Sequence, residues 1–372
     1  MNPSPSRRSF LLGSGTLLLS ARFSAALTAT PPPGTKWDRP LPTPPGLMTP
    51  YKLNRLVLRG SGVHGSFDQK SVDCPFVFHH EGRFYMTYVG FDGIGYQTGL
   101  ATSENLVDWT SEGCILHRDP SSPVTRYNIA MMWILRENDV TSPGNLVKVK
   151  GRYLGAWHAY PKPGYEDGPA VIGLCWSDDL LHWELDPPCL RPDDPDAGAW
   201  EQGGLYKPCL VHHDGKYYIF YNAKTKPVIK HGRTNWFEQT GVAISSDLRI
   251  WKRYAHNPLI HNGPPGSWDS HFASDPCVLR YKNEWAYFYF GLSNTDGKAR
   301  DLLALSKHGM LNPEKTDTAL VVPGPPGSID DDFSHKPSIL MHDGVLYHFY
   351  CAVSGKWPHD TRGISVARSR PW

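Results

Sequence analysis

One short block of residues recurs along this chain, and it limits what the chain can fold into more than any other feature. It reads Thr/Ile-Gly-Leu/Val-Ala/Cys-x-Ser and continues through a short acidic stretch with Leu and Trp. The clear copies span residues 98–109, 172–183 and 240–251, and weaker copies lie at 302–306 and 363–367. Five copies of one supersecondary unit indicate a repeat architecture.

Each copy is preceded by two apolar runs that a turn joins. In the third unit residues 208–211 lead through Asp214 and Gly215 into residues 217–221. Apolar runs joined by Asp-Gly are typical of β-hairpins. A proline marks each unit's first strand, at positions 75, 143, 208, 276 and 337, which are 61 to 68 residues apart. Four short strands per period predict an all-β fold, a five-bladed β-propeller with four antiparallel strands per blade.

The fifth unit ends one strand early, because only six residues follow Val366 in its third strand. Residues 53–58 can supply the missing strand. They run into a Gly-Ser-Phe-Asp sequence at 65–68, just as residues 256–260 run into Gly-Ser-Trp-Asp at 266–269. We therefore predict that the N-terminal segment pairs with the strand around Ile364 and closes the ring, which removes an open sheet edge.

The first 27 residues have the features of a twin-arginine export signal. Arg7 and Arg8 precede an apolar stretch from 11 to 19, and a cleavage point follows residues 24–26. The apolar stretch is shorter than the roughly 20 residues that span a bilayer. We expect a signal peptide at 1–27, a proline-rich linker at 28–50 and the propeller catalytic domain at 51–372, in a periplasmic or extracellular protein.

Charge and cysteine content exclude several function classes. A net charge of +2 predicts neither a nucleic-acid partner nor, after signal removal, a membrane partner. The seven cysteines are an odd number and show no CxxC pair and no spacing typical of zinc sites. Several stand in apolar strands, so we expect small buried side chains. The oligomeric state is left open.

The innermost strands of a propeller surround a central funnel, so residues directly before them converge from different blades. Charged and polar residues occupy these places: Asp73 in the first blade, Thr141 and Ser142 in the second, Tyr206 and Lys207 in the third, Ser274 and Asp275 in the fourth, and His335 and Lys336 in the fifth. Burying two carboxylates, two lysines and a histidine together is costly without a ligand, a partner or water. This predicts a functional site at the funnel mouth.

These residues resemble the five-bladed β-propeller glycoside hydrolases, the group with families 43, 117 and 130 and the invertase-type enzymes. The resemblance rests on Val-Asp-Cys-Pro at 72–75, Ser-Asp-Pro at 274–276, the Gly-x-Tyr-Tyr hairpins and the Ser-x-Asp-Leu-x-x-Trp blocks, and it covers most of residues 53–372. It implies catalytic carboxylates at the starts of innermost strands. Asp73 is thereby the candidate base or nucleophile, and Asp275 is the second carboxylate.

The third carboxylate does not transfer from this resemblance. Family 43 would place a Glu just before the third blade's proline, where this chain has Lys207. Glu201 is our first candidate for the general acid. It belongs to a Gly-Ser/Ala-x-Asp/Glu motif that recurs with Asp68, Asp269 and Asp330, and a carboxylate repeated in four blades is also expected to be structural. The next candidates are Asp332, His335, Glu137 and Asp139.

Six side chains are candidates for holding substrate: Lys207, His271, His335, Lys336, Asp332 and Trp133. The two lysines bind sugar hydroxyls or an anionic group such as a uronate or sulfate, or they form salt bridges with neighbouring acids. Trp133 is either a stacking platform for sugar or part of the core. No metal-ligand spacing appears and no cofactor is required, while a structural cation in the central channel is left open.

The sequence predicts an exported, exo-acting glycoside hydrolase whose partner is a poly- or oligosaccharide. Glycosidic cleavage requires a protonated acid at the leaving oxygen and an ionised carboxylate on the other face of the sugar. Two alternatives stay open. One is a phosphorylase like those of family 130, with Lys207, Lys336 and His271 forming a phosphate pocket. The other is a carbohydrate-binding propeller without catalysis.

Overall fold

The computed structural model describes residues 40–230, 233–356 and 359–372. This part of the chain is all-β apart from a short 3-10 helix, η1 (Pro45–Leu47). Within it, no helix has the length and apolar character needed to cross a membrane. The predicted export signal lies outside the described residues.

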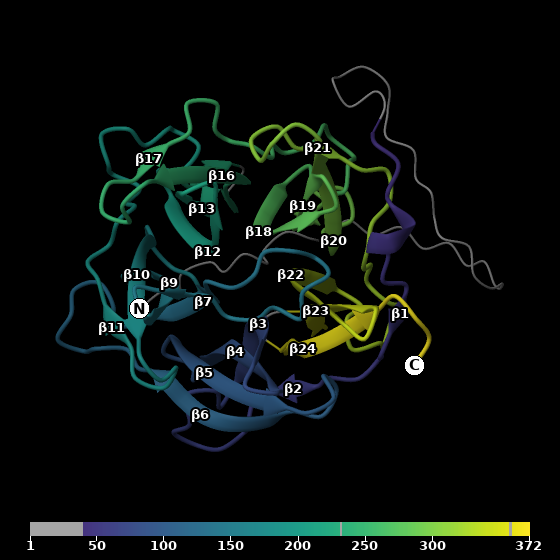
Figure 1. Ribbon diagram of the computed structural model, residues 1–372, viewed down its shortest axis with the longest axis horizontal. Helices are drawn as coiled ribbons and strands as arrows, with labels where there is room; N and C mark the ends of the chain where they lie inside the picture. The colour runs from purple at the N-terminus through teal and green to yellow at the C-terminus, as the bar shows by residue number, and fades with distance from the viewer. Residues whose placement is uncertain (1–39, 231–232, 357–358) are drawn as a thin grey trace.

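Antiparallel strands follow one another along the chain in five groups around a common centre (Figure 1). The first group is β3 (Ser71–His80), β4 (Arg83–Phe91), β5 (Tyr96–Ser103) and β6 (Thr110–Leu116); the second is β7 (Ala130–Ile134), β8 (Lys148–Val149), β9 (Arg152–Ala159), β10 (Val171–Ser177) and β11 (Glu184–Leu185). The third is β12 (Gly204–His213), β13 (Lys216–Lys224), β16 (Glu238–Ser245) and β17 (Lys252–Arg253), with a separate hairpin, β14 (Val228–Lys230) and β15 (Arg233–Asn235), inserted after β13. The fourth is β18 (Phe272–Tyr281), β19 (Glu284–Leu292), β20 (Ala299–Ser306) and β21 (Glu314–Lys315); the fifth is β22 (Phe333–His342), β23 (Val345–Ser354) and β24 (Thr361–Arg368), completed by β1 (Tyr51–Lys52) and β2 (Leu58–Arg59). The first strand of each group lies nearest the centre.

The predicted pairing of the N-terminal segment with the last strand is confirmed. Leu58 of β2 lies opposite Ile364 of β24, and Lys52 of β1 lies opposite Ala367. The outermost strands of the third and fourth groups place a basic residue in the same register: Arg253 opposite Ala243, and Lys315 opposite Ala304. The N-terminal segment therefore occupies the outermost position of the fifth group.

The recurrent block forms the third strand of a group and the turn that follows it. In the second group, Ser177 Oγ accepts the N–H of Leu180 at 2.9 Å, and Asp179 Oδ1 accepts the N–H of His182 at 2.9 Å. The indole N–H of Trp183 donates to the Leu180 carbonyl at 3.0 Å. Short polar side chains that bond nearby backbone groups hold tight turns of this kind. The block is scaffold.

The first strand of the second group differs from the prediction because an insertion interrupts it. β7 lies at the centre, and the chain leaves it at residues 135–147 before β8 resumes the pairing with β9. The insertion bonds the far ends of three other central strands: Gly144 O accepts the N–H of His79 at 3.2 Å, Val140 N–H donates to Arg280 O at 2.8 Å, and Ser142 O accepts the N–H of Met341 at 3.1 Å. The placement of Thr141 and Ser142 at the funnel mouth is therefore wrong, because they lie at the opposite end of the channel from Asp73.

Residues 41–49, which composition assigns to a linker, pack on the fourth and fifth groups. Leu41 bridges to Thr316, and Leu47 is fully buried. Thr49 Oγ1 lies 3.1 Å from Nδ1 of the buried His348. This segment is therefore part of the packed fold.

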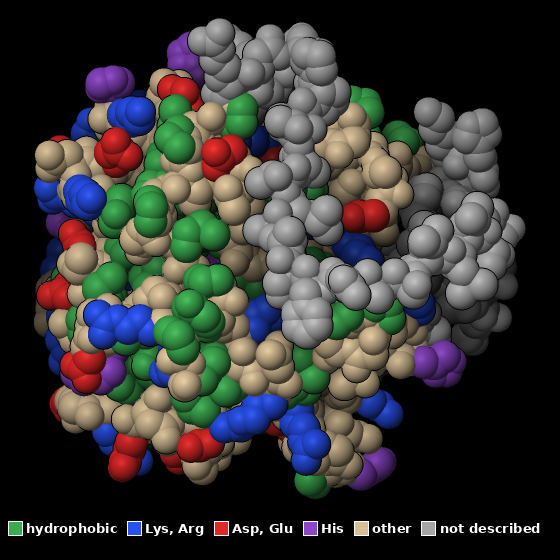
Figure 2. Space-filling model, turned by 90° about the vertical axis from the view of Figure 1, so that its right-hand side faces the viewer, with side chains coloured by type: hydrophobic (Ala, Val, Ile, Leu, Met, Phe, Trp, Pro, Cys, Tyr) green, Lys and Arg blue, Asp and Glu red, His purple; other side chains and the backbone are tan. Residues whose placement is uncertain are grey.

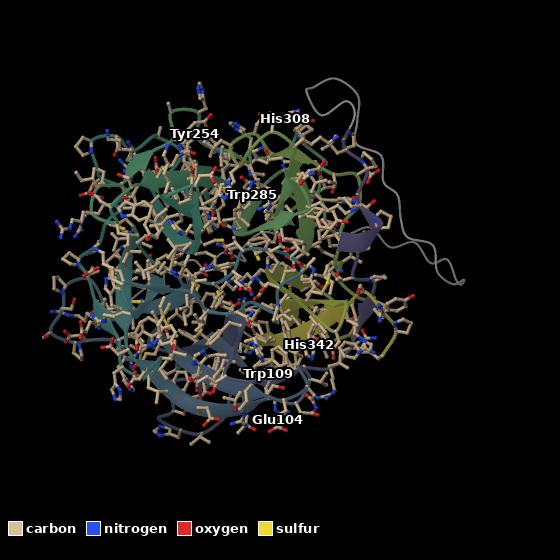
Figure 3. All side chains as sticks on the ribbon, viewed as in Figure 1. Glu104, Trp109, Tyr254, Trp285, His308 and His342 are labelled. Carbon is tan, nitrogen blue, oxygen red and sulfur yellow. The ribbon has the colours of Figure 1, made fainter. Side chains whose placement is uncertain are left out.

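Aromatic side chains make contacts between neighbouring groups, and two of them, Trp109 and Trp285, are labelled in Figure 3. The ring of Trp109 lies edge-on to Phe349, joining the first and fifth groups, and the ring of Trp285 lies 5.0 Å from that of His213, joining the fourth and third. The seven cysteines are unpaired and five are buried, as expected. One outer face carries basic and acidic side chains interspersed with apolar ones (Figure 2), in line with the small net charge.

Candidate active site

Four of the central strands share one irregularity, a break in pairing at the proline. The breaks fall between Asp73 and Phe76, Tyr206 and Cys209, Ser274 and Cys277, and His335 and Ser338. The residue before the proline has positive φ in each case: Cys74 (51°), Lys207 (51°), Asp275 (54°) and Lys336 (69°). Such conformations cost about 1–3 kcal/mol and cluster at functional sites, where a bulge re-aims a side chain. The fold thus gathers these residues and their neighbours at one end of the channel.

Asp73 is held by three donors from distant parts of the chain. Its Oδ2 accepts from Lys336 Nζ at 2.8 Å, from Arg362 Nη1 at 2.6 Å and from the Tyr165 hydroxyl. Its Oδ1 accepts the backbone N–H of Cys74 at 2.7 Å. Burial by itself raises the pKa of Asp73, but the charges of Lys336 and Arg362 outweigh it and hold this pKa well below its usual range. Asp73 is therefore a permanent anion.

The surroundings of Asp275 shift its pKa in the opposite direction from that of Asp73. Asp275 is 2% exposed, and its Oδ1 accepts from Asn222 Nδ2 at 2.8 Å. The same nitrogen donates to Glu238 Oε2 at 3.1 Å, so two carboxyl groups share one amide. Burial raises the pKa of Asp275 to about 6, and the negative charges of Glu238 and Glu166 add to this effect against Lys336 and Lys207. Asp275 can therefore carry a proton in mildly acidic solution.

Two glutamates that sequence reasoning missed complete the cluster. Glu166 lies on the loop 160–170 between β9 and β10, and its Oε1 is 3.4 Å from Lys336 Nζ. Glu238 begins β16, is fully buried and accepts from Ser274 Oγ at 2.9 Å. Glu166 belongs to no repeated motif, so no periodicity indicates it. Glu238 carried a signal, because an acid begins a buried strand just before the third copy of the block.

Glu201 lies in a different, repeated arrangement. Its Oε2 accepts from the Tyr221 hydroxyl at 2.9 Å and from Arg253 Nε at 3.0 Å. Equivalent contacts join Asp68 to Tyr88 (3.5 Å), Asp269 to Tyr289 (3.0 Å) and Asp330 to Tyr350 (2.9 Å), each across 20 residues. Two of these carboxylates also contact a lysine of an outermost strand, Asp269 with Lys315 and Asp330 with Lys52. These contacts favour the structural alternative for Glu201 over the catalytic one.

Of the remaining predicted residues, His335 belongs to the cluster, His271 and Asp332 to its surroundings, and Trp133 to the core. His335 is next to Lys336; burial holds its pKa well below the usual range, and its Nδ1 lies 3.1 Å from Cys351 O. His271 Nε2 lies 2.8 Å from Trp236 O, and Asp332 Oδ1 accepts from Lys356 Nζ at 2.6 Å. Trp133 packs on Phe76 and Arg136 at 3% exposure, so the stacking-platform alternative is wrong and the ring belongs to the core.

Arg136 occupies the central channel below the cluster. Its guanidinium donates to the carbonyls of Val77 at 2.8 Å and Ile339 at 2.6 Å. No group of three or more His, Cys, Asp or Glu side chains in the described part of the chain is placed to hold a metal ion. The channel cation stays a hypothesis, and the charge of Arg136 repels a cation at this depth.

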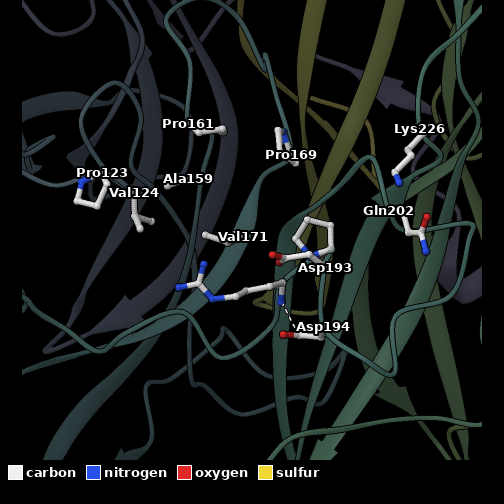
Figure 4. A pocket seen from close by; sticks show the side chains of 12 residues that line it. Pro123, Val124, Ala159, Pro161, Pro169, Val171, Asp193, Asp194, Gln202 and Lys226 are labelled. Carbon is white, nitrogen blue, oxygen red and sulfur yellow. Dashed lines mark hydrogen bonds between the residues drawn. The ribbon is translucent and has the colours of Figure 1, made fainter.

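A separate hollow of about 630 Å³ lies against the 160–170 loop (Figure 4). Pro161 and Pro169, near the two ends of that loop, line it together with Gln202, which precedes β12, and Lys226, which follows β13. Neither Asp73 nor Asp275 lines it. The hollow is therefore distinct from the carboxylate cluster, although the same loop borders both.

Comparisons with known proteins agree with this architecture. Residues 136–308 match the family model for the glycosyl hydrolases family 32 N-terminal domain. A 1,2-beta-oligomannan phosphorylase of Thermoanaerobacter sp. (strain X514) is 26% identical over 168 residues, 44% of this chain and 46% of that protein. The levanase of Bacillus subtilis (strain 168) is 31% identical over 151 residues, 40% of this chain and 20% of the levanase. The chain thus spans less than half the length of these two curated relatives.

Solved structures extend the similarity to most of the chain. One of them, described as a glycoside hydrolase, superposes with a TM-score of 0.73 and 28% identity, covering 87% of this chain and 93% of that protein. From family model, relatives and fold together, the chain belongs to the superfamily of β-propeller glycoside hydrolases.

Proposed function

We propose that this protein is a glycoside hydrolase whose general acid is Asp275. The observation that carries the proposal is the opposite electrostatic treatment of two carboxylates at one end of the channel. The pKa of Asp73 is held well below its usual range, whereas that of Asp275 rises to about 6. Environments that push the pKa values of nearby carboxyls apart divide the anionic role from the acid role.

Asp73 then acts as a fixed anion. Both carboxylate oxygens of Asp73 already accept hydrogen bonds, and two of these bonds come from the cations Lys336 and Arg362. Asp73 is therefore a weak base. Its charge stabilises the positive charge that develops on the sugar. We assign the role of base or nucleophile to Glu166. At 8% exposure it is the most exposed of the four clustered carboxylates, and it shares the ammonium of Lys336 with Asp73.

The insertion at residues 135–147 supports an exo-acting mode. Its bonds to His79, Arg280 and Met341 hold it across the far ends of three central strands, and we propose that a sugar chain reaches the cluster only from the other side. We also propose that the five strand groups are five blades, with β1 and β2 closing the ring, and that residues 1–27 direct export. Loss of the periplasmic protein in an Arg7→Lys, Arg8→Lys variant would support the export proposal; unchanged fractionation would contradict it.

Leaving-group dependence tests the assignment of the acid. A good leaving group departs without protonation, so Asp275→Asn should keep its rate on dinitrophenyl glycosides and lose about 10²- to 10⁴-fold on alkyl glycosides. Glu166→Gln should lose activity on both series, and azide should restore it if Glu166 is the nucleophile. Glu201→Gln is the matched control and should keep both rates. A Glu201→Gln variant with the leaving-group signature would instead make Glu201 the acid.

Phosphorolysis is a second candidate, favoured by the relative that is a 1,2-beta-oligomannan phosphorylase. Product analysis separates the two reactions. A phosphorylase releases a sugar phosphate only in the presence of inorganic phosphate, whereas a hydrolase releases free sugar at an unchanged rate without it.

A further inference from the structure

Lys207 is a buried lysine whose ammonium is paired with no side chain of the described residues. The residue is 6% exposed and stands before Pro208 with a positive φ of 51°. Its backbone N–H points to His158 Nδ1 at 3.4 Å. Among the described residues its ammonium makes no hydrogen bond and no ion pair. A buried ammonium without a partner is costly, so its position calls for a compensating group.

Lys336 occupies the equivalent position in the fifth group, and carboxylates balance the charge of its ammonium. It also precedes a proline with positive φ, and it is 2% exposed. Its ammonium contacts Asp73 at 2.8 Å and Glu166 at 3.4 Å. Among the described residues the fold therefore places two carboxylates in contact with Lys336 and none in contact with Lys207.

The titratable groups that interact electrostatically with Lys207 include Cys74, Asp301 and Asp275. Burial raises the pKa of the Cys74 thiol to about 12, so this thiol is neutral, and burial raises the pKa of Asp301 well above its usual range, which favours its neutral form. Asp275 is the remaining acid under its influence. When Asp275 is protonated to act as the general acid, Lys207 has no anionic counterpart among the residues that the structure describes.

We propose that Lys207 binds a negatively charged oxygen group of the ligand, either the carboxylate of a uronic acid or inorganic phosphate. The inference rests on the proposed function and specifies its substrate class. An ammonium and a ligand oxyanion form charge-assisted hydrogen bonds, which are stronger than those to neutral hydroxyls. The site would thus prefer acidic sugars, or sugar together with phosphate, over neutral sugars alone.

Calorimetric titration of the purified protein tests this with five probes: glucuronate, galacturonate, inorganic phosphate, glucose and galactose. We expect at least one oxyanion to bind, and Lys207→Met to weaken that binding about tenfold or more. Lys207→Arg should keep it within a few-fold. Lys216→Met, at an exposed lysine that begins β13, is the matched control and should bind as the wild type does.

The probes separate the two sources of the oxyanion. Uronate binding alone indicates an acidic glycan, and phosphate binding alone indicates phosphorolysis. The inference is overturned if neither oxyanion binds, or if Lys207→Met binds it as tightly as the wild type. That result would leave the hydrolase proposal intact wherever glycosides are turned over with the dependence on Asp275 described above.

Discussion

The outer carboxylate–tyrosine pairs and the residues before the prolines both recur around the molecule, but they repeat different things. The outer pairs repeat their chemistry: Glu201, Asp269 and Asp330 each accept from a tyrosine 20 residues later and contact a cation from an outermost strand. The pre-proline positions repeat only their backbone. Chemistry that is repeated in several units serves the fold, whereas different chemistry on a common backbone builds one asymmetric site.

The sharpest test of this contrast replaces one aspartate of each class with asparagine. Asp73→Asn removes the fixed anion, so kcat/KM on a substrate glycoside should fall by about 10²-fold or more. Asp269→Asn, in an outer pair, should leave kcat within a few-fold and lower stability instead. Steady-state kinetics on protein shown to be folded by circular dichroism decide this, and a comparable kinetic loss in Asp269→Asn would break the comparison.

Lysines at equivalent positions should respond in opposite directions. Lys336→Met removes one of the two buried cations that contact Asp73 and leaves Glu166 without this ion pair, so it should lower the free energy of unfolding by about 3–5 kcal/mol. Lys207→Met removes an unpaired buried charge and should leave stability unchanged or raise it. Urea unfolding measures both. A large destabilisation by Lys207→Met would show that the protein itself neutralises this lysine.

The pH dependence of stability should show the buried acid. The pKa of Asp275 is about 6 in the folded state and about 3.9 in an unfolded chain, so ionisation favours unfolding. Its unfavourable contribution appears as the pH rises from 4 to 6 and reaches about 3 kcal/mol above that range. Asp275→Asn should therefore gain more stability over the wild type at pH 8 than at pH 5. An equal gain at both pH values would contradict the raised pKa.

The smallest expected effect belongs to a single outer hydrogen bond. Tyr289→Phe deletes the hydroxyl that donates to Asp269 at 3.0 Å and should lower the free energy of unfolding by about 1–3 kcal/mol. The rate on every substrate should stay that of the wild type. A changed pH–rate profile in this variant would mean that the outer pairs communicate with the site.

Sequence reasoning reached the site most reliably where a repeat singled out a position. Asp73, Lys207, Asp275 and Lys336 were all found because each stands one or two residues before a proline at the start of a central strand. Glu166 was out of reach, since it lies on an unrepeated loop and meets Lys336 170 residues along the chain. The second group was misread because its proline belongs to the insertion at residues 135–147, and an insertion shifts a period without leaving a local mark.

By itself the sequence determined the β-strand period, the turns and the pairing of the N-terminal segment with β24. These depend on local alternation and turn chemistry, which neighbouring residues specify. Only the tertiary structure decided which charges meet. Asp73 is balanced by Arg362, 289 residues away, whereas Lys207 has no such partner among the described residues. The chemistry of a buried ionisable group is set by its neighbours in space, and the order of residues along the chain does not contain that information.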